Sequence, residues 1–137
     1  MSSVTSALSD VAASLSPDEL TKKVEEIKAA GNERFLKGDY TQAKALYTDA
    51  LSLNPNIVAI YSNRAICELK LEQYGLAIAD ATKAIELDAT FAKAYYRRAC
   101  AHLAILDPKA ALPDLKMVMK LDPRNAQVKM QLDATSK

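Results

Sequence analysis

The sequence has few of the residues that build sheets, disulfide frameworks or metal sites. Its 137 residues include three glycines, no tryptophan, two cysteines and one histidine. Cys67 and Cys100 stand in no Cys-x-x-Cys or Cys/His cluster, so neither a disulfide framework nor a metal site is supported. Long stretches rich in Ala, Leu, Lys and Glu favour helices throughout. We expect an all-α chain in which both cysteines pack as small apolar residues.

A dominant charge and long apolar runs are also missing. Eighteen Lys and Arg against 17 Asp and Glu leave a formal net charge of +1, so no overall basic field attracts nucleic acids or membranes. The apolar runs are far shorter than the roughly 20 residues that span a bilayer, and residues 1–16 lack the features of a secretory signal. We expect a soluble, intracellular chain with no nucleic-acid or membrane partner, in which any anion recognition is local.

The apolar content predicts one folded domain after a short tail. Half of the residues are hydrophobic, which is enough to bury a core. A helix start is indicated by SPDE, with Ser16 as the N-cap, Pro17 at the first position and Glu19 completing a capping box. The residues before Ser16 are rich in Ser and Ala, so we predict a disordered tail over 1–15 and a domain over 16–137.

A repeat of 34 residues organises the domain. Shifting the sequence by this length superposes three sets of mostly small residues, namely Gly31, Ala65 and Ala99, then Ala43, Ala77 and Ala111, then Ala50, Ala84 and Val118. Each unit is interpreted as a helix, a short turn and a second helix, with turns at 37–40 and 71–74. The units are 24–57, 58–91 and 92–125, and residues 126–137 begin a further helix.

This pattern resembles the tetratricopeptide repeat (TPR), whose small residues and late proline are matched over about three quarters of the chain. The resemblance implies a right-handed superhelix in which the first helix of each pair lines a concave groove. Because no single pair buries its apolar face alone, stacking supplies the stability. The resemblance also implies a capping helix, of which 126–137 are the start, and we expect the chain to be a fragment of a longer protein.

Pro113 conflicts locally with this plan. It lies inside the second helix of the third unit, where it cannot donate a hydrogen bond to Lys109 and can kink the helix at a cost of about 3 kcal/mol. Pro108 is easier to accommodate because it lies near the helix start. We therefore expect a bend or a loose first turn in this helix.

Five cationic and amide side chains fall on the first helices of the three units: Lys28, Asn32, Asn63, Lys93 and Arg97. Residues four apart lie on one face of a helix, and we expect all five to point into the groove, with no acid in the same ring. Two cations four apart cost a few tenths of a kcal/mol, which a bound carboxylate would offset. Arg binds a carboxylate through its planar fork, and Asn amides donate neutral hydrogen bonds.

The same five residues, in KAAGN, YSNRA and KAYYRRA, match the two-carboxylate clamp of TPR co-chaperones. The resemblance implies that they hold the last side-chain carboxylate and the terminal carboxylate of a Glu-Glu-Val-Asp tail, as found on heat-shock proteins 90 and 70. Phe35 lies on the same helix face as Asn32. It packs either against an apolar residue of such a peptide or in the seam between helices.

Within these co-chaperones, YGLAIADATKAIELD at 74–88 and KAYYRRA at 93–99 are most similar to the N-terminal domain of the protein phosphatase 5 family. The resemblance implies a parent serine/threonine phosphatase whose catalytic domain, with a dinuclear metal centre, is inhibited by the repeat domain. The fragment itself would hold no cofactor and act in the cytoplasm, with the nucleus as a second compartment. Glu72 either matches the inhibitory contact or is a solvated turn residue.

Catalysis by this chain itself is not supported. His102 has no Cys, Ser or carboxylate partner at motif spacing, and no Gly-rich phosphate loop or metal signature occurs. We predict a binding domain without catalytic or metal-ligating residues. Arg64 and Arg98 point away from the clamp by roughly 100° and are assigned to packing or to the surface. The alternatives are the TPR domain of another co-chaperone, of immunophilin or adaptor type, and a generic repeat scaffold.

Overall fold

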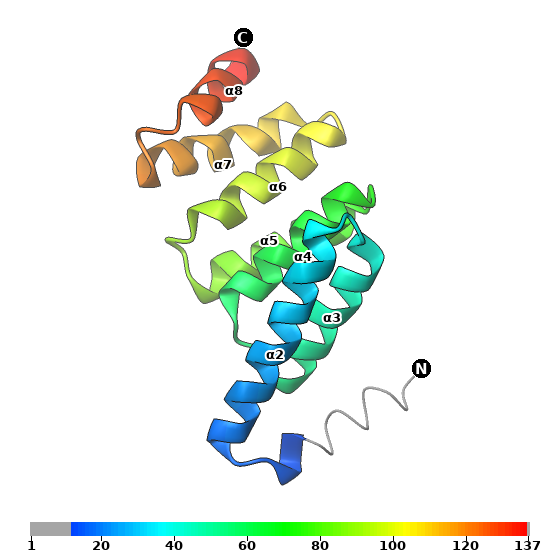
Figure 1. The fold of residues 1–137 in the computed structure, drawn as a ribbon. Coiled ribbons are helices and arrows are strands. Elements are labelled where there is room, and N and C mark those ends of the chain that lie inside the picture. The colour runs from blue at the N-terminus through cyan, green and yellow to red at the C-terminus, as the bar shows by residue number, and fades with distance from the viewer. Residues whose placement is uncertain (1–11, 137) are drawn as a thin grey trace.

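The computed structural model describes residues 12–136, which form helices joined by short connections and contain no strand. The helices are α2 (Pro17–Leu36), α3 (Tyr40–Leu53), α4 (Val58–Lys70), α5 (Tyr74–Leu87), α6 (Ala92–Ala104), α7 (Pro108–Leu121) and α8 (Ala126–Ser136). They stack in chain order, from α2 at one end of the molecule to α8 at the other (Figure 1).

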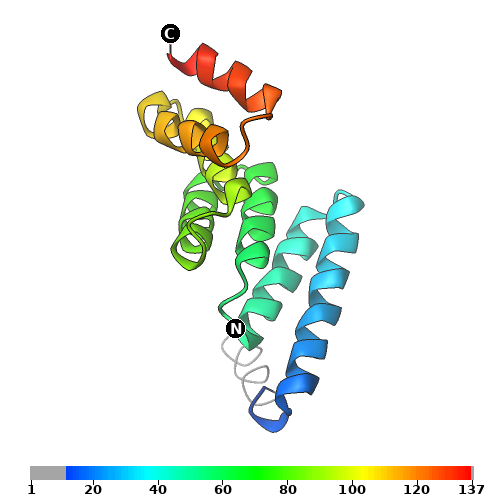
Figure 2. The ribbon, with the colours of Figure 1, turned by 90° about the vertical axis from the view of Figure 1, so that its left-hand side faces the viewer.

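Consecutive helices form three hairpins, α2 with α3, α4 with α5, and α6 with α7. Neighbouring hairpins meet through α3 and α4 and through α5 and α6, and α4 also contacts α6 directly. The view turned by 90° shows the hairpins following one another along the stack (Figure 2). Helix α8 packs on α7, where Val128 is buried and Leu132 is partly buried against the same core cluster.

Small residues lie where paired helices approach closely. The fully buried ones at the repeated positions are Ala43, Ala50, Ala65, Ala77, Ala84, Ala99 and Ala111. At Gly31 even a methyl group does not fit, because an added Cβ would lie 2.7 Å from Cε1 of Tyr47. Small residues therefore recur every 34 residues because at these positions the helix backbones lie too close together for larger side chains.

The start of α2 agrees with the predicted capping box. The Ser16 hydroxyl accepts a hydrogen bond from the Glu19 backbone N–H at 3.2 Å, and the Glu19 carboxylate accepts one from the Ser16 N–H at 3.2 Å. Of the predicted disordered tail, residues 1–11 lie outside the described residues. Residues 12–14, however, form a helical turn, because Ala12 packs against the hydrophobic core.

Pro113 does not interrupt α7, which is helical from Pro108 to Leu121. The first turn is firmly held, since the Asp107 side chain accepts a hydrogen bond from the Ala110 N–H at 3.2 Å. The expectation of a loose first turn was therefore wrong. Pro113 and Lys109 are both exposed, so water can satisfy the Lys109 carbonyl that lacks its helical donor.

The turn inside each hairpin contains one residue with a left-handed backbone. These residues are Gly38, Glu72 and Leu106, with φ of 78°, 60° and 62°, and they occupy the same position of the repeat. Glycine adopts this conformation without steric penalty, whereas other residues are strained there by roughly 1 to 2 kcal/mol. Two of the three turns therefore carry strain.

Relieving this strain at Leu106 is expected to stabilise the protein. Leu106 is 87% exposed, so Leu106→Gly removes little buried contact and raises the free energy of unfolding by about 1 kcal/mol. Ile105, one residue earlier, has φ of −93°, and Ile105→Gly is expected to lower stability instead. Urea denaturation of the two variants tests this pair, and a loss of stability in Leu106→Gly would contradict the strain.

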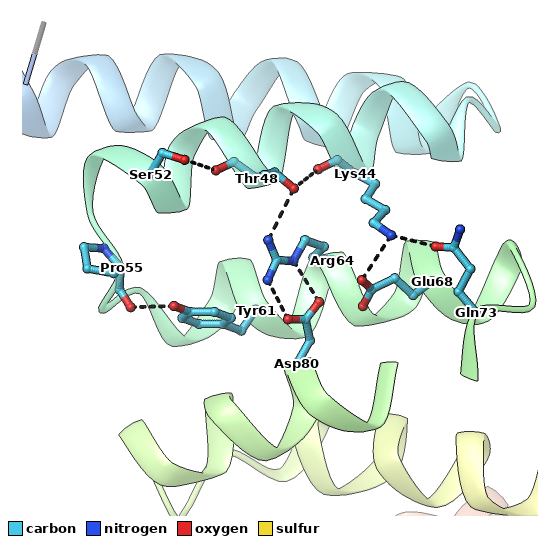
Figure 3. Close-up of polar contacts among 9 residues, drawn as sticks. All are labelled: Lys44, Thr48, Ser52, Pro55, Tyr61, Arg64, Glu68, Gln73 and Asp80. Atoms are coloured by element: carbon cyan, nitrogen blue, oxygen red, sulfur yellow. Dashed lines mark hydrogen bonds and ion pairs between the residues drawn. The ribbon is translucent and has the colours of Figure 1, made fainter. Parts of the chain in front are cut away.

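A polar cluster joins the first two hairpins. Arg64 on α4 donates from Nε and Nη2 to the two carboxylate oxygens of Asp80 on α5, at 2.7 and 2.6 Å. It also donates from Nη1 to the Thr48 hydroxyl on α3 at 3.3 Å. Figure 3 shows Arg64 between Thr48 and Asp80, so that one guanidinium links three helices.

The same cluster recurs one repeat later. Arg98 on α6 donates to both oxygens of Asp114 on α7, at 2.8 and 2.7 Å, and to the Thr82 hydroxyl on α5 at 3.2 Å. Arg64 and Arg98 therefore have the packing role that was one of the two assigned from the sequence. Bidentate pairing of this kind fixes geometry as well as adding energy.

Candidate functional site

Two predicted amide residues meet in a hollow between α2 and α4. The hollow has a volume of about 190 Å³ and is lined by Asn32, Phe35, Leu36, Tyr47, Asn63 and Ile66. Asn63 donates from Nδ2 to Oδ1 of Asn32 at 3.4 Å. The first helices of the first and second hairpins thus contribute one polar group each to the same place.

Tyr47 closes this hollow from α3, the second helix of the first hairpin. Its hydroxyl donates to Oδ1 of Asn32 at 2.5 Å, and its side chain is buried. Burial raises the pKa of Tyr47 to about 12, so the hydroxyl keeps its proton at neutral pH. The Asn32 oxygen therefore receives two hydrogen bonds from within the protein.

Phe35 has the packing role considered from the sequence, and its contact with a peptide residue stays a prediction. It packs against the hydrophobic core, with its ring centroid 5.4 Å from that of Tyr40 in an edge-on arrangement. It also lines the hollow beside Leu36, which is 84% exposed. An apolar ligand group in the hollow would therefore meet a ring that the core already holds in place.

Lys93 and Arg97 lie in a second hollow, formed by α6 and the end of α7. This hollow has a volume of about 270 Å³ and is lined by Ala92, Lys93, Tyr96, Arg97, Val118, Asp122 and Asn125. Asp122 departs from the expectation that no acid shares this ring. It lies in the connection from α7 to α8, which the repeat spacing did not place beside α6.

Arg97 is a half-buried cation without a carboxylate partner among residues 12–136. Its Nε is buried and makes no hydrogen bond, and its guanidinium carbon lies 5.5 Å from the Tyr96 ring centroid. Burial lowers the pKa of Arg97, although a guanidinium remains charged in proteins. Arg64 and Arg98 donate hydrogen bonds to aspartates, whereas Arg97 has no carboxylate partner within the described residues.

Lys28 lies one helical turn before Asn32 on α2 and is half-buried. It lines neither hollow, and within residues 12–136 it forms no hydrogen bond or ion pair. The structure thus places the predicted residues in two separate hollows, with Lys28 outside both. That all five residues act on one ligand stays a prediction.

No metal or membrane-spanning feature occurs in the part of the chain that the structure describes. No group of three or more His, Cys, Asp or Glu is arranged to hold a metal ion there. None of its helices has the length and apolar content needed to cross a membrane. The side chains that converge are instead cations, amides and aromatic rings, which suit an anionic organic ligand.

Comparison with known proteins places this geometry in a family. The family model of the tetratricopeptide repeat matches residues 29–57 and 58–91. The first TPR domain of Spaghetti (RPAP3), solved bound to the HSP90 peptide SRMEEVD, superposes with a TM-score of 0.82 at 30% identity. The superposition covers 84% of this chain and 91% of that one. The chain belongs to the tetratricopeptide repeat family.

Two further relatives share the repeat domain. The TPR2B domain of yeast Sti1, solved in a pHsp70 complex, superposes with a TM-score of 0.79 at 33% identity over 84% of this chain and 97% of that one. Serine/threonine-protein phosphatase 5 of Rattus norvegicus is 41% identical over 116 residues, which are 85% of this chain and 23% of the phosphatase. The predicted fold class, a superhelix of three TPR hairpins with a further C-terminal helix, is confirmed.

The residues that line the hollows but were not predicted from the sequence include Tyr47, Asp122 and Asn125. Tyr47 occupies the repeat position that holds Ala81 and Leu115 in the other units. This departure from the repeat was the available signal for Tyr47. Asp122 follows Asn54 and Asp88 at the 34-residue spacing, but that spacing does not tell which helix a residue beyond the end of α7 lies beside, and the same holds for Asn125.

Proposed function

We propose that this TPR domain binds the free acidic C-terminus of a chaperone tail of the Glu-Glu-Val-Asp type, on heat-shock protein 90 or 70. The observation that carries the proposal is Arg97, a half-buried guanidinium that has no carboxylate partner among residues 12–136 and lies one helical turn from Lys93. The similar solved domains bound to an HSP90 peptide and to pHsp70 support it.

The two hollows suggest how the two carboxylates of the peptide end are distributed, one to each hollow. Lys93 and Arg97 supply charged donors to one, and the amides of Asn32 and Asn63 supply neutral donors to the other, with Lys28 adding charge nearby. Only a chain end offers a terminal and a side-chain carboxylate so close together. Charged hydrogen bonds contribute about 1.5 to 3 kcal/mol each, so after the entropy of binding we expect a micromolar complex, near −8 kcal/mol.

Amidating the peptide C-terminus is expected to weaken binding at least about tenfold, because one carboxylate loses its charge. Arg97→Ala is expected to have an effect of the same size. Asp122→Asn should strengthen binding, since an acid in the same hollow repels an anion. Isothermal titration calorimetry with a short peptide ending in Glu-Glu-Val-Asp measures all three changes.

Lys83→Ala is the matched control, because Lys83 is an exposed lysine on α5 that lines neither hollow. It should bind the peptide like the unmodified domain. Equal affinity for the free and amidated peptides would rule out carboxylate recognition. Added salt should weaken the complex without abolishing it, because partly buried ion pairs are screened less than exposed ones.

We further propose that the domain recruits chaperones to an attached serine/threonine phosphatase and inhibits that enzyme until a tail binds. Its support is the 41% identity with phosphatase 5 of Rattus norvegicus, of which the chain spans 23%. The dinuclear metal centre would belong to that separate domain, in the cytoplasm or nucleus. The sequence of the whole parent protein tests this proposal, and a metallophosphatase domain in it would support the proposal. A different domain there would favour the adaptor, immunophilin or scaffold alternatives.

A further inference from the structure

Tyr47 reaches the Asn32 amide because its ring passes directly over Gly31, which has no side chain. An added Cβ at Gly31 would lie 2.7 Å from Cε1 and 3.2 Å from Cζ of Tyr47, so the ring lies directly against the α2 backbone. The ring is 1% exposed. From this fixed position its hydroxyl meets the next residue of α2, Asn32, at 2.5 Å.

Two donors converge on one atom of Asn32. The Tyr47 hydroxyl and Nδ2 of Asn63 both donate to Oδ1, at 2.5 and 3.4 Å. An amide has its acceptor on one side and its two N–H donors on the other. Rotating the Asn32 amide by half a turn would direct its NH₂ group at the NH₂ group of Asn63 and lose that bond. A tyrosine hydroxyl can accept as well as donate, so the Asn63 bond sets the orientation of the Asn32 amide and the Tyr47 bond holds the amide in it, with Nδ2 left for an outside acceptor.

An aromatic ring at this position, four residues after Ala43, belongs to the packing pattern of the TPR, but the hydroxyl is not needed for that packing. In the other units the position of Tyr47 holds Ala81 or Leu115, and the position of Asn32 holds Ile66 or Cys100. A buried tyrosine hydroxyl at this position therefore occurs only where the neighbouring first helix carries an amide. The pairing suggests a task that belongs to Asn32 rather than to the helix stack.

We propose that Tyr47 is a positioning residue for peptide recognition, whose hydroxyl, together with the Asn63 amide, holds the Asn32 amide so that its NH₂ group, not its oxygen, faces the ligand carboxylate. This role rests on the proposed function. A carboxylate only accepts hydrogen bonds, so the opposite amide orientation would repel it. Locking the amide before the peptide arrives also removes an ordering cost from binding.

The test is Tyr47→Phe, which keeps the buried ring and removes only the hydroxyl. We expect the dissociation constant for a peptide ending in Glu-Glu-Val-Asp to rise about 3- to 10-fold. The matched control is Tyr61→Phe, because the Tyr61 hydroxyl also makes one partly buried bond, to the Pro55 carbonyl at 2.7 Å. Tyr61 does not line the hollow, so Tyr61→Phe should bind the peptide normally despite a similar loss of stability.

A double-mutant cycle separates positioning from general damage. In an Asn32→Ala background, Tyr47→Phe should cause no further loss of affinity, because there is no amide left to orient. The proposal is overturned if Tyr47→Phe binds like the unmodified domain, or if its effect persists fully without the Asn32 amide.

A measurement without peptide distinguishes this proposal from the binding proposal. In ¹⁵N–¹H spectra of the free domain, the side-chain NH₂ signals of Asn32 should shift in Tyr47→Phe and stay in place in Tyr61→Phe. Unchanged signals in Tyr47→Phe would show that the hydroxyl does not orient the amide. Failure of the unmodified domain to bind the peptide would instead overturn the proposed function, and the ligand role of Tyr47 with it.

Discussion

Asp114→Ala is expected to lower the free energy of unfolding by about 3 kcal/mol. Asp114 is 4% exposed and accepts hydrogen bonds from Nε and Nη2 of Arg98 at 2.8 and 2.7 Å. Truncating one partner of a buried pair leaves the other charge without compensation, which commonly costs about 3 to 5 kcal/mol. We expect the lower end, because the Arg98 side chain is still 24% exposed. Urea denaturation followed by circular dichroism measures the change.

Two further variants identify the cause of this loss. Asp133→Ala removes an exposed acid on α8 that forms no ion pair within residues 12–136, and it should change stability by less than about 0.5 kcal/mol. Removing both charges, with Arg98→Met and Asp114→Leu, should recover much of the lost stability, since no buried charge then remains. If Asp114→Ala were as mild as Asp133→Ala, the pair would contribute nothing to hairpin packing.

These pairs also explain how the stack ends. Leu132 on α8 occupies the same position of the repeat as Arg64 and Arg98, 34 residues after Arg98. It packs with Val128 against the last hairpin. An apolar contact therefore replaces the ionic one at the final interface. Repeat proteins need such an atypical last unit because each hairpin otherwise leaves an apolar face uncovered.

The helices and their pairing followed from local and periodic features of the sequence. The capping box at Ser16 and Glu19 involves residues three apart, so the sequence alone locates it. The partner of Arg64 could not be located in this way. Asp80 is 16 residues away on another helix, and their contact depends on how the two helices turn relative to one another. Spacing rules describe faces of one helix, not contacts between helices.

In the candidate site, too, the sequence predicted contacts within one helix but not contacts between helices. Lys93 and Arg97 share a hollow because residues four apart lie on one helix face. Tyr47 comes from the second helix of a hairpin, so a search of the first helices could not find it. Asp122 lies in a connection whose path depends on how α8 packs. The pair on α6 was predictable from one helix face, whereas Lys28 on α2 lies outside both hollows and the residues that close them from other elements were not predicted.

Raising the pH from 5 to 8 is expected to destabilise the domain through Glu68. Glu68 is 2% exposed, its Oε1 has no hydrogen-bond donor, and its Oε2 lies 3.4 Å from Nζ of Lys44 (Figure 3). Burial, and then the neighbouring carboxylate of Asp80, raise the pKa of Glu68 to about 8, against the lowering effects of Lys44 and Arg64. Arg64 binds both oxygens of Asp80, so Glu68 is the one of these two carboxyl groups that has no guanidinium partner.

The sign follows from which state holds this proton. Below a pH of about 4.5 Glu68 is protonated in the folded and the unfolded chain, so its contribution does not change with pH. Between about 4.5 and 8 only the folded chain keeps the proton, and stability falls by up to about 1.4 kcal/mol per pH unit. Above about 8 both states are ionised and the loss, on the order of 5 kcal/mol in total, is complete.

Glu68→Gln isolates this contribution, because the amide keeps the shape of the protonated acid and does not ionise. Urea denaturation between pH 5 and 8 should show a smaller fall in stability for Glu68→Gln than for the unmodified domain, and the variant should be the more stable at pH 8. Glu86→Gln, on an exposed part of α5, should leave the profile unchanged. Parallel profiles for the unmodified domain and Glu68→Gln would mean that Glu68 is already ionised at pH 5, held by Lys44 alone.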